Sequence, residues 1–186
     1  MAARALSARK KSRVKAALLI TDLEVIARRA KENRDDYEAF RYFVEEDARS
    51  DAALDRLVAE LAAPIVEAID CTTCANCCQK LNVYLTPADA DRLTTGLNIP
   101  LSEVTTRYLD HFKAGKEEEW GIVTKSPCPF LRGKLCGLYE YRPETCRSYP
   151  EFTPDFRWQL SNILAGAGIC PIIFNTIEAV KQTLKW

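Results

Sequence analysis

The chain has 186 residues, with 26 basic and 26 acidic side chains, so its formal net charge is zero. Hydrophobic residues make up 47% of the chain and charged residues 28%, values typical of folded proteins, which excludes a chain that is disordered throughout. There is also no basic stripe interleaved with aromatic residues, the usual signature of nucleic-acid binding. No apolar run approaches the roughly 20 residues of a membrane span, so we expect a soluble protein with no nucleic-acid or membrane partner.

Basic residues are concentrated at the N-terminus. The segment that precedes Asp22 contains no acidic side chain and six basic ones, namely Arg4, Arg9, Lys10, Lys11, Arg13 and Lys15. We interpret this segment as the solvated end of a helix, because short basic starts are common. The alternative is an organelle transit peptide, which has the same acid-free composition. On the first interpretation the protein is expected in the cytoplasm.

The N-terminal part of the chain, 1–66, is predicted to form a helical appendage with no chemistry of its own. Apolar residues recur at helical spacing over 14–31, again over 37–48, and most regularly over 54–69. Pro64 interrupts the third pattern, so we expect it to kink this helix or to start a new one. The remainder, 67–186, is expected to form a small, irregular, cysteine-rich metal-binding domain.

A capped helix is predicted early in that second part. The alternating residues 81–85 indicate a short strand. Thr86 then offers an N-cap oxygen, Pro87 occupies the first helical position, and Asp89 is an acidic residue in the first turn. The helix is expected to end at Gly96.

The remaining elements are expected to be short. Ser102 is a candidate cap for a helix that continues to Phe112, and residues 120–124 indicate a loop or a strand pair. Proline and glycine recur from 126 to 154, which predicts loops that wrap around something. A last helix is predicted over 175–185. The fold class is therefore mainly α with a few short strands.

Cysteine is the unusual feature of the composition. The eight cysteines are Cys71, Cys74, Cys77, Cys78, Cys128, Cys136, Cys146 and Cys170, so the helical N-terminal part contains none. Four of them fall within eight consecutive positions. In a reducing compartment such clustering indicates metal or redox chemistry rather than structural disulfides.

The proximal cysteines have the spacing of a metal site. Two residues between successive cysteines, as in Cys71-x2-Cys74-x2-Cys77, allow a tight turn to direct the sulfurs at one metal. Three cysteines in tandem are similar to the start of a ferredoxin motif, in which each thiolate holds one iron. Cys77 and Cys78 are adjacent and project apart. Either they bind different metals, or one of them is not a ligand.

The distal cysteines are more widely spaced. Cys128, Cys136 and Cys146 follow one another at moderate intervals, and a longer stretch separates them from Cys170. Proline follows both Cys128 and Cys170, as it follows the last cysteine of the ferredoxin motif. Gly133 predicts a turn that brings Cys136 back toward Cys128. Four plus four cysteines fit two four-thiolate sites, but they also fit one cluster plus a redox pair or free thiols.

Other polar residues give weaker signals. His111 is the single histidine, and we interpret it as a partly exposed helix residue rather than a ligand. Arg132, Arg142 and Arg147 flank the distal cysteines, where they would either offset thiolate charge or pair with surface glutamates. The chain has no phosphate loop, nucleophile elbow, dinucleotide fingerprint or catalytic triad. The sequence therefore does not decide whether the protein is an enzyme.

The cysteine regions resemble a known family. Cys-Thr-Thr-Cys-Ala-Asn-Cys-Cys at 71–78, the segment 84–93 and the blocks 128–131, 136–140 and 142–150 are similar, in order, to the zinc- or iron-chelating CxxCxxCC family of YkgJ-like proteins. The resemblance implies Cys71, Cys74, Cys77, Cys78, Cys128, Cys136 and Cys146 as ligands, and Cys170 fits it loosely. One branch of the family is related to flagellin N-methylase-like proteins.

We therefore expect a cysteine-ligated metal-binding protein in which the proximal and distal cysteines form one compact group. An iron–sulfur cluster is favoured over zinc, because three tandem thiolates suit a cluster and the distal set has no Cys-x2-Cys knuckle. The centre is expected to be structural, sensing or electron-transferring. The alternatives are an enzyme that modifies a protein partner, similar to a lysine N-methylase, and a metallochaperone or zinc store.

Overall fold

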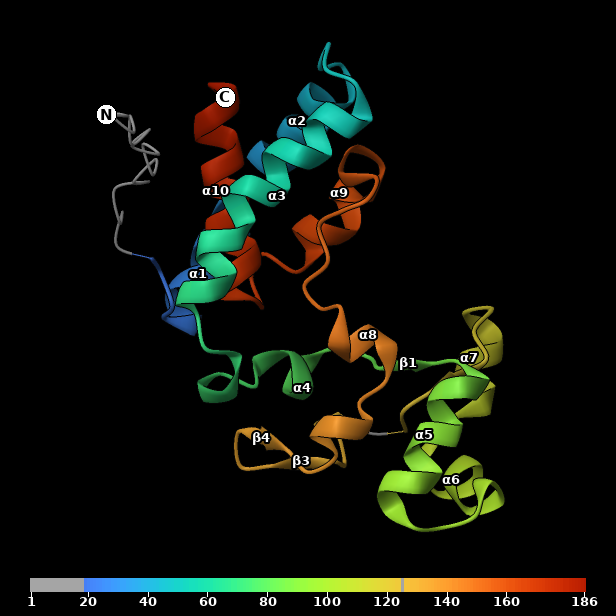
Figure 1. The fold of residues 1–186 in the computed structure, drawn as a ribbon. Helices are drawn as coiled ribbons and strands as arrows, with labels where there is room; N and C mark the ends of the chain where they lie inside the picture. The colour runs from blue at the N-terminus through green and yellow to red at the C-terminus, as the bar shows by residue number, and fades with distance from the viewer. Residues whose placement is uncertain (1–18, 125) are drawn as a thin grey trace, which may run out of the picture.

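The computed structural model describes residues 19–124 and 126–186, and within these ranges the fold is mainly α (Figure 1). The α-helices are α1 (Leu23–Glu32), α2 (Arg34–Glu45), α3 (Asp51–Ala68), α4 (Asn76–Lys80), α5 (Pro87–Leu97), α6 (Leu101–Tyr108), α7 (His111–Lys116), α8 (Glu144–Arg147), α9 (Phe156–Ala165) and α10 (Pro171–Leu184). Short 3-10 turns lie at η1 (Cys71–Thr73) and η2 (Tyr139–Tyr141). Strand β1 (Tyr84–Leu85) pairs antiparallel with β2 (Gly121–Ile122), and β3 (Leu131–Arg132) with β4 (Leu135–Cys136). The predicted fold class is confirmed.

The larger hydrophobic core joins the first helices to the last two. Phe40 of α2, Val58 of α3, Phe156 of α9 and Ile177 of α10 are fully buried in one cluster. Figure 1 shows these helices together in one lobe, with α1 beside α10. The N-terminal helices therefore share their core with residues from the other end of the chain. The division into an appendage and a domain at residue 66 stays a prediction.

Helix α3 differs from its prediction at Pro64. Ser50 caps the helix by accepting a hydrogen bond from the Ala53 amide at 3.3 Å, and the helix then continues without interruption to Ala68. Of the two predicted alternatives, a new helix at Pro64 is therefore wrong, and a kink there stays a prediction. Pro64 lies on the exposed face of α3, where water can satisfy the carbonyl that the missing proline N–H leaves free.

Helix α9 has no counterpart among the elements predicted from the sequence. It follows a proline-rich loop, and its N-cap Asp155 has a left-handed conformation and no capping hydrogen bond from its own side chain. The cap comes instead from α3, because the Asp55 carboxylate accepts the amides of Asp155 and Phe156 at 3.0 and 2.9 Å. Since Asp55 lies far away in the sequence, local patterns give no signal of this cap.

A second, smaller core lies under α5, α6 and the β1–β2 pair. Leu85, Leu93, Val104 and Phe130 are buried in it, away from the first core. Figure 1 shows α5, α6 and α7 together in a second lobe. The chain runs between the lobes through α4 and α8, and both of these helices carry cysteines.

The capping box of α5 is confirmed. Thr86 accepts the Asp89 amide at 3.2 Å, while the Asp89 carboxylate accepts the Thr86 amide at 2.8 Å. The helix ends at Leu97, with left-handed Asn98 as its C-cap, and not at Gly96. Gly96 instead permits close packing, because a Cβ atom there would lie 2.7 Å from the ring of Tyr141.

The predicted helix from Ser102 to Phe112 is divided in two. Helix α6 begins at Leu101, and its N-cap is Pro100 rather than Ser102. The chain is extended at Leu109, and Asp110 then starts α7 by accepting the Lys113 amide at 2.8 Å. Of the loop or strand pair predicted over 120–124, the structure has the single strand β2, which pairs with β1, and the strand predicted over 81–85 is reduced to β1.

The first and the last helix both begin at other residues than predicted. Asp22 caps α1, so the helix predicted over 14–31 begins at Leu23, and residues 14–18 lie outside the described ranges, as do the six basic N-terminal side chains. The last helix starts at Pro171, earlier than predicted.

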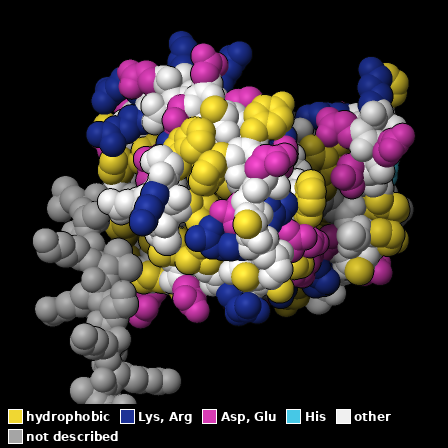
Figure 2. All heavy atoms as spheres, turned by 90° about the horizontal axis from the view of Figure 1, so that it is seen from above, with side chains coloured by type: hydrophobic (Ala, Val, Ile, Leu, Met, Phe, Trp, Pro, Cys, Tyr) yellow, Lys and Arg dark blue, Asp and Glu magenta, His cyan; other side chains and the backbone are white. Residues whose placement is uncertain are grey.

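In the described ranges no helix combines the length and the apolar character that a membrane span requires. Basic and acidic side chains are interspersed on the face shown in Figure 2.

Candidate metal centre

A cavity of about 570 Å³ is lined by all eight cysteines. Cys71 lies in η1 and Cys74 directly after it, while Cys77 and Cys78 lie in α4. The distal cysteines are Cys128 in the loop before β3, Cys136 in β4, Cys146 in α8 and Cys170 directly before α10. Cys71 is exposed, Cys170 is buried, and the other six are partly buried. The structure therefore brings the proximal and distal cysteines together, as the sequence predicts.

The loop of the proximal cysteines is shaped locally and then fixed to a distant segment. Asp70 caps η1 by accepting the Thr72 amide at 2.9 Å, and Ala75 turns the chain with a φ angle of 57°. The buried Asn76 side chain donates a hydrogen bond to the Ile169 carbonyl at 2.7 Å. Because Ile169 precedes Cys170, this bond holds the 71–77 loop beside the last cysteine.

Cys128 and Cys136 are held by backbone hydrogen bonds. The Cys128 amide donates to the Cys78 carbonyl at 2.8 Å, which connects the distal loop to α4. The Cys128 carbonyl in turn accepts the Leu131 amide at 3.0 Å, and Leu131 is the partner of Cys136 in the β3–β4 hairpin. Gly133 has a φ angle of 63°, as the tight hairpin turn requires. The predicted return of Cys136 toward Cys128 is confirmed.

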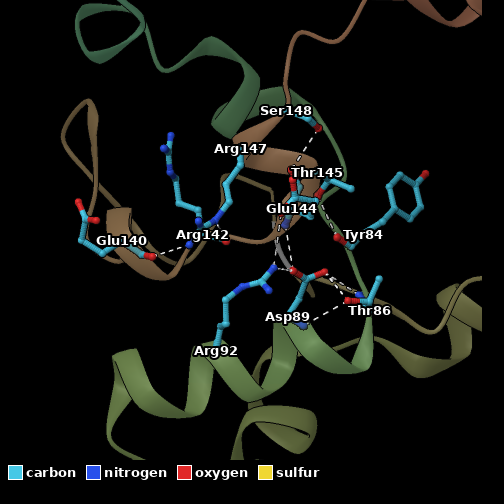
Figure 3. Close-up of polar contacts among 10 residues, drawn as sticks. All are labelled: Tyr84, Thr86, Asp89, Arg92, Glu140, Arg142, Glu144, Thr145, Arg147 and Ser148. Atoms are coloured by element: carbon cyan, nitrogen blue, oxygen red, sulfur yellow. Dashed lines mark hydrogen bonds and ion pairs between the residues drawn. The ribbon is translucent and has the colours of Figure 1, made fainter. Parts of the chain in front are cut away.

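Cys146 lies on the short helix α8, which Asp89 positions (Figure 3). The Asp89 carboxylate is 1% exposed, accepts the Glu144 amide at 2.9 Å, and also forms an ion pair with Arg92. The Thr145 hydroxyl donates to the Tyr84 carbonyl at 3.0 Å. The capping box of α5 thus also fixes the first turn of α8, a role that the sequence does not reveal.

Burial and neighbouring sulfurs raise the pKa of several thiols. Burial raises the pKa of Cys146 to about 12, and the thiols of Cys128, Cys78 and Cys136 add to this increase. Burial also raises the pKa of Cys170 to about 11, although the amides of the following turn oppose it. These thiols are protonated at neutral pH, so a metal must displace their protons to bind.

The thiols of Cys77 and Cys78 lie close together but differ in pKa. Their Sγ atoms lie 3.9 Å apart, so the prediction that these adjacent side chains project apart is wrong. The hydrogen bond between them raises the pKa of Cys77 and lowers the pKa of Cys78. The charge of the Arg142 guanidinium also lowers the pKa of Cys78. Cys78 is therefore the thiol of this pair that ionises first, as the first step of metal binding requires.

Of the three arginines near the distal cysteines, one faces the thiols. The charge of Arg142 opposes the increase in the pKa of Cys71 and of Cys146. Arg132 and Arg147 instead donate to backbone carbonyls of their own loops. In the part of the chain that the structure describes, none of the three forms an ion pair with a glutamate. Only Arg142 therefore serves the predicted role of offsetting thiolate charge.

The donor set of the cavity fits a soft metal or a cluster. Among the described residues that line it there is no carboxylate and no histidine, while Lys80, Lys134 and Arg142 supply positive charge. His111 lies elsewhere, against the Trp120 ring. Thiolates are the ligands preferred by zinc and by iron–sulfur clusters. Within the described ranges, however, no three potential ligands are already gathered around one ion position.

A buried hydroxyl also faces this group of thiols. The Tyr149 Oη is buried beside the Cys170 thiol and makes no other hydrogen bond within the described residues. Burial raises the pKa of Tyr149, and the neighbouring thiols of Cys170 and Cys77 raise it further. A buried hydroxyl with no other partner is unusual and fits a position beside a bound group. The sequence does not reveal the roles of the Tyr149 hydroxyl and of the Asn76 side chain, because both depend on long-range contacts.

Comparison with protein families gives a match over residues 70–171 to the family described as "Putative zinc- or iron-chelating domain", named CxxCxxCC. The match covers more than half of the chain and includes all eight cysteines. The chain belongs to this family. Among curated proteins and among solved structures, no significant match is found. The CxxCxxCC assignment confirms the resemblance, and it leaves the choice between zinc and iron open.

Proposed function

We propose that this CxxCxxCC protein is a metal-binding module whose cysteines hold iron as an iron–sulfur cluster, with a sensing, electron-transferring or structural role. The observation that carries the proposal is the cavity lined by all eight thiols. A described lining without carboxylate or imidazole side chains disfavours hard cations such as magnesium and calcium. The positive side chains at its edge would offset the negative charge of a thiolate centre.

The spacing of the thiols favours a cluster over a single zinc ion. Four sulfurs around one zinc ion each lie about 2.3 Å from it, so they must be nearly in contact with one another. In a cluster each thiolate holds a different iron, and the ligands stand further apart. Apart from Cys77 and Cys78, whose Sγ atoms lie 3.9 Å apart, the thiols surround a cavity without converging on one point, which suits the second arrangement. Bound there, the cluster would supply one-electron redox chemistry.

A binding module is favoured over a modifying enzyme. The described lining holds no carboxylate or histidine that would move a proton for catalysis. Cys71 is exposed, which would place part of the centre near the surface and within reach of an oxidant or of a redox partner. Leu135 and Tyr139 on the same rim are also exposed, so a protein partner that docks there is part of the proposal.

Protein purified without oxygen from cells supplied with both iron and zinc would test the metal. We expect brown protein with broad visible absorption, containing iron and acid-labile sulfide, because a thiolate-bound cluster has both. Exposure to a chelator and an oxidant should bleach the colour and release both components. Colourless protein with stoichiometric zinc and no sulfide would refute the cluster and leave the zinc alternative.

A further inference from the structure

We infer that the eight thiols form two separate four-cysteine sites, each with its own metal ion or cluster. The first site consists of Cys71, Cys74, Cys77 and Cys170, and the second site consists of Cys78, Cys128, Cys136 and Cys146. This inference rests on the proposed metal-binding function. It differs from the order of the cysteines along the chain, because Cys78 leaves the proximal set and Cys170 leaves the distal set.

The first site is assembled against the larger core. Cys170 is 7% exposed and belongs to the cluster formed by α2, α3, α9 and α10. The hydrogen bond from Asn76 to the Ile169 carbonyl fixes the proximal loop next to it. The buried Tyr149 hydroxyl lies beside the Cys170 thiol. When Cys170 binds a metal as a thiolate, its sulfur would accept a hydrogen bond from that hydroxyl.

The second site is assembled against the smaller core. Cys128 and Cys136 pack on the cluster that contains Phe130. The backbone bond from Cys128 to Cys78 adds the end of α4, and the Asp89 contact with Glu144 places α8 with Cys146 on the same side. Each member of this site is thus attached to the lobe of α5 and α6, or directly to another member.

The division passes between two adjacent residues. Cys77 and Cys78 are consecutive in α4 and their Sγ atoms lie 3.9 Å apart, so the two sites meet at this pair. One helical turn can therefore supply one ligand to each side.

Arg142 lies at the junction of the two sites. Arg142 lines the cavity that the cysteines of both sites share. A cation shared by two thiolate centres reduces the repulsion between them. Arg142 stacks on the Tyr139 ring at 3.6 Å, and its Nε donates to the Tyr139 carbonyl, so its position is fixed.

Graded metal removal from the full-length protein would test the division without mutation. Anaerobic protein is treated with increasing chelator, alkylated, and digested, and each cysteine is quantified by mass spectrometry. We expect two groups of four, such that Cys77 becomes reactive with Cys170, and Cys78 becomes reactive with Cys146. Reactivity that instead rises together for all eight cysteines, or together for Cys71 to Cys78, would overturn the inference.

Single substitutions provide the second measurement. Cys170→Ser should remove about half of the metal and expose Cys71, Cys74 and Cys77, while the second site stays protected. Cys146→Ser should do the reverse, and the exposed Val66→Ser on α3 should retain all of the metal. Unchanged metal content in Cys170→Ser, or complete loss in either cysteine variant with the helical content retained, would refute the division. Wild-type protein without any metal would instead refute the proposed function.

Discussion

Replacing Arg157 by alanine is expected to lower the free energy of unfolding by about 3–5 kcal/mol, the cost of breaking a buried, charged network. Arg157 is 6% exposed on α9, and its guanidinium donates to the Asp51 carboxylate at 2.7 Å. It also donates to four carbonyls at the end of α2 and in the α2–α3 connection, namely those of Val44, Glu45, Asp47 and Arg49. Alanine removes all of these hydrogen bonds and opens a cavity. Lysine cannot replace the planar fork of donors.

Urea unfolding would measure this effect, with Trp158→Phe as the matched control. Trp158 is 66% exposed and donates to the same Asp51 carboxylate at 3.3 Å, so its loss should change stability by less than about 0.5 kcal/mol. The domain is expected to have roughly 5–15 kcal/mol of stability, so the Arg157 variant loses a large share of it. A change as small as that of the control would show that the network does not hold α2, α3 and α9 together.

Asp89→Asn is expected to cost about 2–4 kcal/mol at neutral pH, because a buried carboxylate with several donors is replaced by a neutral amide. One carboxylate oxygen accepts from Thr86, and the other accepts from Glu144 and Arg92. In the amide, one of these positions becomes an NH₂ group that faces other donors. Since Asp89 positions α8, the variant should also retain less metal at Cys146.

The pH dependence of the same variant separates charge from packing. Burial raises the pKa of Asp89, but the amides of Thr86 and Glu144 and the Arg92 charge lower it more, so it lies below its ordinary value. A depressed pKa means that the stabilisation is complete above the unfolded pKa of about 3.9 and is lost as the pH falls through the folded pKa. The stability difference between wild type and variant should therefore shrink below about pH 4. A difference that is constant with pH would show that the Asp89 charge contributes nothing.

Local sequence signals predict the elements whose determinants are local. The capping box of Thr86 and Asp89, the hairpin turn at Gly133 and the amphipathic helices α2 and α3 lie where the sequence places them. Helix α9 escapes prediction because its N-terminus is capped by Asp55 from another helix. Pro64 does not end α3, because the carbonyl that it leaves free faces solvent.

The grouping of the cysteines depends on contacts that spacing does not encode. Tandem spacing predicts that Cys71, Cys74 and Cys77 lie together, and the family resemblance predicts that the two cysteine regions meet. The place of Cys170 depends on the long-range bond between Asn76 and Ile169. The place of Cys128 depends on its bond to the Cys78 carbonyl. Both bonds form only when the two lobes are folded and adjacent.

Native mass spectrometry of intact, anaerobically purified protein tests most directly whether the cysteines hold metal. We predict a mass above that of the metal-free chain, with an excess equal to the bound iron and sulfide minus the thiol protons displaced. Acid denaturation should return the mass of the free chain with eight alkylatable thiols. A native mass equal to that of the free chain, with all eight thiols already reactive in protein from cells supplied with iron and zinc, would contradict the account.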